Sequence, residues 1–162
     1  MPLLRESFIL FGIALIPCAM LAGLLMYGNP IHDFHAWRLK QNFYAKNIEH
    51  PADSMLIEKK FYLGGISVHG GDVCAYAVGE WRTSTISKQE IIDTYNSIEV
   101  SLGAEKIPVK VMFAGEYDSP NILPDEYWQD YLRGTVTDER VHYIMYVSAK
   151  RPIVWFDFRC NA

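Results

Sequence analysis

The fold is decided by residues 55–82, MLIEKKFYLGGISVHGGDVCAYAVGEWR, in which two apolar runs lie on either side of a glycine-rich centre. The first run, at about residues 55–63, stops at Gly64-Gly65, and the second, at about residues 73–82, follows Gly70-Gly71. Paired glycines supply the positive φ angles that tight hairpin connections require. The stretch therefore predicts two antiparallel strands joined as a β-hairpin.

The second of these strands is apolar on both faces. Alternation places Cys74 and Tyr76 on one face and Ala75 and Trp81 on the other. A strand of this kind is typically covered on both sides. We therefore expect the Cys74 side chain to be buried.

The residues after the hairpin predict further helices and strands. Ser87 and Glu90 form a capping-box pattern at the start of a helix expected over residues 88–102, and Gly103 supplies its stop. Alternating apolar residues predict a strand over 107–113, at a sheet edge because it contains a proline. The remaining expected elements are a short helix over 124–133 and strands over 142–149 and 153–160, with a turn at 150–152 between them.

This order of elements predicts the class of the domain. Strands and helices follow one another as β-β-α-β-α-β-β between residues 51 and 162. We expect an α+β domain whose antiparallel sheet has about five strands and one main packed helix.

The N-terminal part of the chain predicts a membrane anchor. Residues 8–27, FILFGIALIPCAMLAGLLMY, are uncharged, and as a helix they would match the roughly 30 Å hydrocarbon layer of a bilayer. A cleaved signal peptide usually has a shorter apolar run of about 7 to 15 residues. We expect residues 1–28 to form a tail and one retained transmembrane helix, with the lipid bilayer as a partner.

Small residues recur within this span. Ala14, Cys18 and Ala22 are spaced by four residues, as are Ala19 and Gly23. Such a strip lets a second helix approach closely, so other transmembrane helices of a membrane complex are the expected partners. The alternative is that alanine and glycine are simply common in membrane helices.

Residues 29–50 are expected to form an amphipathic juxtamembrane helix and linker. Phe34, Trp37, Tyr44 and Ile48 fall near one helical face. Aromatic residues of this kind suit the headgroup zone of a membrane.

Two histidines on this helix form a candidate metal site. His32 and His35 are three residues apart and could face an ion from one side. No third ligand lies at a suitable spacing, so two solvated histidines are the simpler interpretation. No cofactor is predicted.

The side of the membrane that holds the domain is indicated by two opposed signals. Arg38, Lys40 and Lys46 after the span outnumber Arg5 before it, which favours a cytoplasmic domain. Two cysteines in the soluble part favour an oxidising compartment, where disulfides persist. We favour the exported, periplasmic side and leave the cytoplasmic side open.

The most reactive set in the chain comprises His69, Asp72, Cys74 and Glu80. A thiolate nucleophile needs a base within reach and an exposed, electropositive setting, and the expected burial of Cys74 argues against it. The competing prediction is a disulfide between Cys74 and Cys160 that ties the second strand to the last. Both interpretations stay open at the level of sequence.

Charge and motifs exclude two classes of ligand. The net charge of -4 argues against binding to nucleic acid, which requires clustered cations. The glycine pairs lack the Gly-x-x-x-x-Gly-Lys pattern of a phosphate-binding loop, so nucleotide binding is not expected.

Three segments together resemble a pattern in small bacterial proteins of uncharacterised function. They are HPADSMLIEKKFYLGG (50–65), GDVCAYAVGEWR (71–82) and DFRC (157–160), which share His-Pro then Ser, a glycine-rich turn, Cys-x-Tyr, Gly-Glu-x-Arg and Arg-Cys with those proteins. A more polar turn before the first cysteine is expected in that family than Gly-Gly-Asp-Val-Cys here. The resemblance implies a bacterial source and a cysteine pairing, and it implies no activity.

These observations favour a non-enzymatic function. We expect a single-pass, membrane-anchored accessory or assembly subunit of a larger membrane protein complex. The alternative is an exported membrane-bound enzyme or ligand-binding module that uses the region of His69, Asp72 and Cys74.

Overall fold

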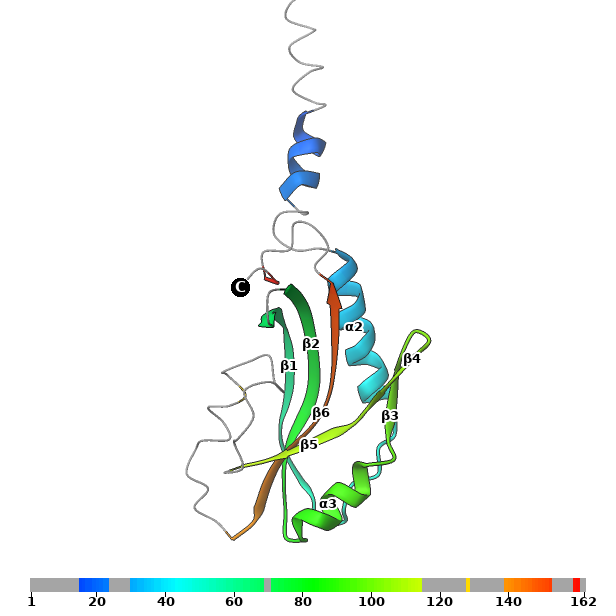
Figure 1. Ribbon diagram of the computed structural model, residues 1–162, viewed down its shortest axis with the longest axis vertical. Coiled ribbons are helices and arrows are strands. Elements are labelled where there is room, and N and C mark those ends of the chain that lie inside the picture. The colour runs from blue at the N-terminus through cyan, green and yellow to red at the C-terminus, as the bar shows by residue number, and fades with distance from the viewer. Residues whose placement is uncertain are drawn as a thin grey trace, which may run out of the picture.

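The computed structural model describes residues 15–23, 30–68, 71–114, 128, 139–152 and 159–160, with the backbone alone for 66–68, 71 and 72. Residues 15–23 are helical. The elements that follow are α2 (Pro30–Ala45), β1 (Met55–Val68), β2 (Gly71–Ser84), α3 (Lys88–Tyr95), β3 (Glu99–Leu102), β4 (Glu105–Pro108), β5 (Lys110–Phe113) and β6 (Val141–Pro152) (Figure 1).

The strands form two antiparallel sheets. The larger sheet has four strands in the order β1-β2-β6-β5, and β3 pairs with β4 in a two-stranded sheet. The predicted α+β class and antiparallel pairing are confirmed. The larger sheet has four described strands where about five were expected, and β3 and β4 form a separate pair.

The predicted hairpin is present and longer than expected. β1 and β2 pair from Met55 opposite Thr83 to Val68 opposite Gly71. Gly64-Gly65 does not end β1 as predicted, because both glycines stay in register with β2. A Cβ atom at Gly65 would overlap the main chain of Cys160, so the glycine is required for a close approach of two backbones.

The helix predicted over 88–102 is shorter than expected. The capping box between Ser87 and Glu90 is present, and α3 ends at Tyr95. The next residues form β3, in which buried Val100 lies opposite buried Ile107 of β4. Cross-strand burial overrides the helical spacing here.

Gly103 has a different role from the one predicted. It has a φ of 68° and lies in the turn between β3 and β4, where it reverses the chain rather than stopping a helix.

The strand predicted over 107–113 is divided. The chain leaves the two-stranded sheet at Val109, whose N–H donates to the Ile98 carbonyl at 2.8 Å, and then enters β5. The turn predicted at 150–152 is wrong, because β6 continues to Pro152 opposite Val73. The helix predicted over 124–133 lies outside the described residues except for Trp128, and so do 153–158 of the last predicted strand.

The core lies on both faces of β2. Residues 74–78 are each at most 1% exposed, which confirms the predicted double coverage and the burial of Cys74. Cys74, Tyr76 and Val78 face the larger hydrophobic cluster, while Ala77 belongs to the smaller one.

Helix α2 packs on the larger cluster through one face and leaves two of the aromatic residues expected near the headgroups exposed. His32, Ala36, Leu39 and Phe43 are buried, whereas Phe34 and Trp37 are 51% and 55% exposed. These buried positions follow the four-then-three spacing of one helical face. Figure 1 shows α2 beside the sheet, with the helix over 15–23 beyond the end of the domain where α2 begins.

The expected membrane span is described only in part. Residues 8–14 and 24–27 lie outside the described residues, and so does Ala14 of the small-residue strip. Within the described ranges, no helix reaches the length and apolarity needed to cross a bilayer. Cys18, Ala19 and Ala22 are exposed on the helix over 15–23, and Gly23 has no atom within 4 Å of where a Cβ would lie.

Candidate functional site

Two clusters of side chains lie toward opposite ends of β2. His50, Ser54, Glu80 and Arg82, with Tyr95 and Tyr143, form the polar cluster. His32, Cys74, Tyr76 and Cys160 form the cysteine cluster. Cys74 and Glu80 are six residues apart on one strand, so the two clusters are separated by about 20 Å.

The polar cluster is centred on an ion pair within β2. Glu80 and Arg82 point to the same side of the strand, and the Nε of Arg82 donates to the Glu80 carboxylate at 2.8 Å. Both residues are only 8% exposed. The Arg82 guanidinium also donates to the Ser54 hydroxyl at 3.0 Å, which supplies part of the hydrogen bonding that a buried ion pair requires.

His50 and two tyrosines extend the polar cluster. The His50 Nδ1 lies 3.0 Å from the Tyr95 hydroxyl, which lies 3.2 Å from the Tyr143 hydroxyl. Burial lowers the pKa of His50, the Arg82 charge lowers it further, and Glu80 at 3.8 Å opposes the shift. Burial also raises the pKa of Tyr95 well above its usual range.

The hydrogen bonds of the polar cluster indicate structural anchoring rather than nucleophilic catalysis. Among the described residues, the Ser54 hydroxyl bonds to Tyr143 at 2.9 Å and to Arg82, and not to a histidine base. Asp53 beside it accepts from Ser84 and Thr85, and these hydrogen bonds lower its pKa to about 2. The cluster therefore fastens the segment before β1 onto β2 and β6.

A small pocket opens beside this network. Its volume is about 270 Å³, and Tyr44, His50, Lys59 and Glu80 are among the residues that line it. The desolvated imidazole and the carboxylate give it the chemistry to bind a small polar ligand.

The cysteine cluster contains the predicted disulfide partners. Cys74 and Cys160 lie at disulfide distance, with their Cα atoms 4.8 Å apart, and both are fully buried. This placement fits the predicted disulfide. The thiolate nucleophile considered from the sequence is not available in this state.

The other members of the predicted reactive set do not join Cys74. His69 and the Asp72 side chain lie outside the described residues. Glu80 belongs to the polar cluster, where it pairs with Arg82. The structure therefore does not bring Cys74 and Glu80 together.

The two histidines considered as a metal site lie in different environments. His32 is 1% exposed and its Nδ1 forms a hydrogen bond with the Tyr76 hydroxyl, whereas His35 is partly exposed. The interpretation of both as solvated residues is wrong for His32. The residues that lie near His32 are the two cysteines rather than His35. One ligand atom each of His32, Cys74 and Cys160 lies within 4.8 Å of the others.

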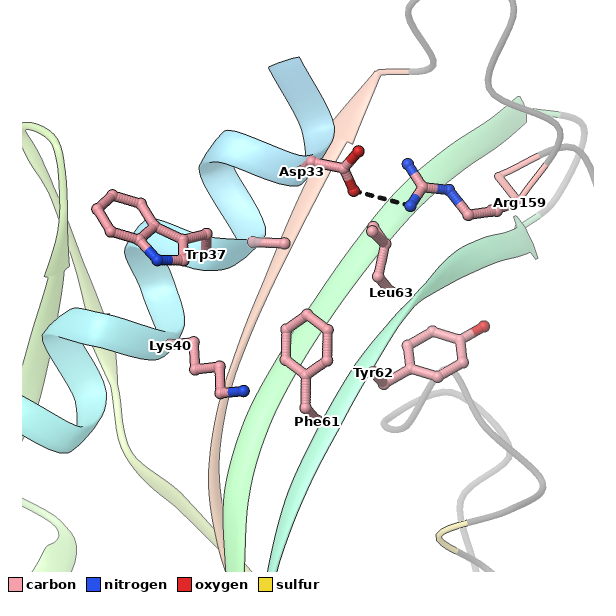
Figure 2. A pocket seen from close by; sticks show the side chains of 8 residues that line it. Asp33, Trp37, Lys40, Phe61, Tyr62, Leu63 and Arg159 are labelled. Atoms are coloured by element: carbon pink, nitrogen blue, oxygen red, sulfur yellow. Dashed lines mark hydrogen bonds and ion pairs between the residues drawn. The ribbon is translucent and has the colours of Figure 1, made fainter. Parts of the chain in front are cut away.

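A groove with a volume of about 540 Å³ lies between α2 and β1. Figure 2 shows its lining, which comprises Asp33, Ala36, Trp37 and Lys40 from α2, Phe61, Tyr62 and Leu63 from β1, and Arg159 at one end.

The groove combines exposed aromatic rings with charged groups. Trp37 is 55% exposed and Phe61 is 43% exposed, and the Lys40 ammonium lies 5.4 Å from the centre of the Phe61 ring. Asp33 and Arg159 close one end with an ion pair of 2.7 Å. The sequence does not predict the groove, because β1 and the C-terminal turn approach α2 only in the folded chain.

The position of β1 adds backbone groups to this surface. β1 is an edge strand of the four-stranded sheet, and none of the described strands pairs with its outer side. An exposed edge strand offers hydrogen-bonding groups to another chain. Aromatic rings, cations and a sheet edge together suit contact with a protein segment better than a reaction.

Comparison with known proteins finds no matching family model, no matching curated protein and no matching solved structure.

Proposed function

We propose that this chain is a single-pass, membrane-anchored accessory or assembly subunit of a larger membrane protein complex, and that it contacts its partner through the groove between α2 and β1. The observation that supports this function is the exposed apolar surface of α2. Ile31, Phe34 and Trp37 are 51%, 51% and 55% exposed, and the groove continues this surface to Phe61. Contiguous exposed apolar surface of this kind is typical of sites that contact another protein or a membrane.

The anchor we propose is the uncharged segment over 8–27. It ends three residues before α2 begins at Pro30, so a spanning segment would hold the first turns of α2 at the membrane surface. Trp37 and Phe34, whose ring centres are 6.0 Å apart, would then lie near the headgroups. A partner with its own transmembrane helices would meet this surface and the small-residue strip together.

The cysteines support one side of the membrane in this proposal. A buried disulfide between Cys74 and Cys160 supports an oxidising compartment. We therefore place the domain on the exported, periplasmic side in this proposal. Accessibility of a C-terminal tag to an impermeant reagent tests it, and a tag that is labelled only after the membrane is opened to the cytoplasm would overturn it.

The contact is tested on the full chain in native membranes. The chain is solubilised in mild detergent and its mass is measured with the complex intact, for the wild type and for Trp37→Glu and Phe61→Glu. We expect the wild type to run with a partner that contains transmembrane segments, and the charged variants to run alone. Ile92→Glu is the matched control, because Ile92 is 38% exposed on α3 and does not line the groove.

Two results would overturn the proposed function. A wild-type chain that is a stable monomer in mild detergent has no complex to serve. If both charged variants retain the partner, the complex does not form through the groove. Ala22→Leu with Gly23→Leu tests the strip in the membrane in the same way.

A second candidate is a ligand-binding module built around the polar cluster. The specific observation is the pocket in which desolvated His50 lies 3.8 Å from Glu80. Thermal stabilisation of the wild type by a small polar ligand, lost in Glu80→Gln, would support this function. Equal stabilisation of both chains would remove it.

A further inference from the structure

We propose that the cysteine cluster is a redox-controlled site for a soft divalent metal ion. In the disulfide state it binds no ion, and in the dithiol state Cys74, Cys160 and His32 hold one Zn²⁺. These three residues come from β2, the C-terminal turn and α2, so the site exists only in the folded chain.

The distances within the cluster fit a tetrahedral ion. Zn–S bonds of about 2.3 Å and Zn–N bonds of about 2.0 Å place tetrahedral ligand atoms about 3.5 to 3.8 Å apart. One ligand atom from each of His32, Cys74 and Cys160 lies within 4.8 Å of the others. Once the disulfide is reduced, the two sulfur atoms can separate to the required spacing by small side-chain rotations. Two cysteines and one histidine are a ligand set that zinc favours over harder cations.

The charges of this buried site balance when a zinc ion is bound. His32 is 1% exposed, and Cys74 and Cys160 are 0% exposed. Two buried thiolates would be strongly disfavoured alone, whereas two thiolates and one Zn²⁺ have no net charge. The site would exchange its disulfide bond for metal–sulfur bonds without leaving a buried charge uncompensated.

The surroundings of His32 resemble those of a metal-binding histidine. Its Nδ1 forms a hydrogen bond with the Tyr76 hydroxyl, which orients the ring from the same strand that carries Cys74. Outer partners of this kind fix ring orientation at metal sites. A water molecule would complete the fourth position.

The three segments are also held together without the disulfide. The Gly65 N–H donates to the Arg159 carbonyl at 2.6 Å, next to Cys160 in the chain. The Arg159 guanidinium donates to Asp33 at 2.7 Å, next to His32. The C-terminal turn, β1 and α2 therefore keep the ligands near one another after reduction.

The exchange between the two states balances chemically. A dithiol reductant transfers two electrons and two protons to the Cys74–Cys160 bond and closes to a disulfide itself. Binding of Zn²⁺ to the resulting thiols then releases their two protons, since the thiolate is the ligand. Reoxidation of the pair would expel the ion.

The test uses the full chain in detergent and Co²⁺ as a probe. The chain is reduced with dithiothreitol, desalted under anaerobic conditions and titrated with Co²⁺ alone. We expect one equivalent to produce thiolate-to-cobalt charge-transfer absorption, which Zn²⁺ then abolishes. The unreduced chain should give no such band. Near-ultraviolet circular dichroism before and after reduction checks that the reduced chain stays folded.

Variants assign the ligands. His32→Gln, which keeps a side chain of similar size, should weaken Co²⁺ binding about tenfold or more, and Cys160→Ser should abolish the charge-transfer band. His35→Gln is the matched control from the same helix, because His35 is partly exposed, and its affinity should equal that of the wild type.

Three results would overturn the proposal. A folded, reduced chain without the charge-transfer band binds no metal through its thiols. Equal affinity of His32→Gln and the wild type removes the histidine from the site. Unfolding of the reduced wild type, with or without Co²⁺, shows that no folded dithiol state exists to hold an ion.

Discussion

The main chain of Cys160 lies directly against Gly65, so that β1 has no room for a side-chain carbon at this position. Gly65 is opposite Cys74 in the sheet, and Cys74 is the disulfide partner of Cys160. The absent side chain, the strand register and the disulfide therefore describe one close contact. Gly65, which resembles a strand terminator in the sequence, is the residue against which the C-terminal turn packs.

Replacement of Gly65 should separate these two backbones. Gly65→Ala places a carbon where the Cys160 carbonyl now lies, and the turn can move only by straining the disulfide or its hydrogen bond to Gly65. We expect a loss of about 1 to 3 kcal/mol in the free energy of unfolding, measured by denaturant titration. Gly64→Ala is the control, because the new carbon would meet the outer end of the Tyr62 side chain, which can rotate. Equal stability of the two variants would contradict the contact.

The disulfide predicts the reactivity of all three cysteines. Cys18 is exposed and free, whereas Cys74 and Cys160 are paired and buried. Alkylation of the folded, unreduced chain should modify Cys18 alone, and reduction under denaturing conditions should expose two more thiols to the reagent. Mass spectrometry of the intact chain counts the adducts. Three adducts without reductant would exclude the disulfide.

Removal of the disulfide should also lower stability. The bond closes a loop between residues 86 positions apart, for which the chain-entropy model gives about 4 to 5 kcal/mol. Cys74→Ala with Cys160→Ala should therefore unfold at a much lower denaturant concentration than the wild type. Cys18→Ala is the control and should leave the unfolding midpoint unchanged.

Local patterns predicted the elements that depend on local physics. The capping box at Ser87 and the two apolar faces of β2 were visible because each follows from neighbouring residues alone. The end of α3 was not predictable in this way. Ile98 and Leu102 continue the helical spacing of the residues before them, and only the pairing of Val100 with Ile107 across the turn makes this segment a strand.

The face of α2 and the cysteine cluster show the same limit. The helix carries Phe34 and Trp37 on an exposed face and Ala36, Leu39 and Phe43 on the buried one, and helical spacing alone does not say which face the sheet covers. His32 was considered with His35 because helical spacing was the only geometry available. Its actual neighbours, Cys74 and Cys160, approach it through long-range contacts that no local pattern encodes.

His50 predicts a loss of stability in mild acid. Its pKa is lowered from 6.5 in the folded chain, first by burial and then by the Arg82 charge. As pH falls below 6.5, the unfolded state binds a proton before the folded state does, so this contribution to stability is full above pH 6.5 and declines below it. His50→Gln, which can retain a hydrogen bond to Tyr95, should lose less thermal stability than the wild type between neutral and acidic pH. Parallel pH profiles for the two chains would contradict the assignment.

The ion pair between Glu80 and Arg82 should respond to substitution as a buried pair rather than a surface pair. Both residues are 8% exposed and joined at 2.8 Å, so Glu80→Gln leaves the Arg82 charge without its carboxylate in a poorly solvated site. We expect a loss of about 3 kcal/mol in the free energy of unfolding. Glu99→Gln is the matched control, because the Glu99–Lys106 pair is 3.7 Å long and its side chains are 50% and 72% exposed, and it should lose under about 1 kcal/mol.

A double substitution separates the charge from the packing at this site. In Glu80→Met with Arg82→Met both charges are removed, so no unpaired ion remains and the apolar side chains fill a similar volume. The double variant should therefore be more stable than Glu80→Gln in a denaturant titration. If it is less stable than Glu80→Gln, the Arg82 contact with Ser54 rather than the ion pair is what holds the segment before β1 in place.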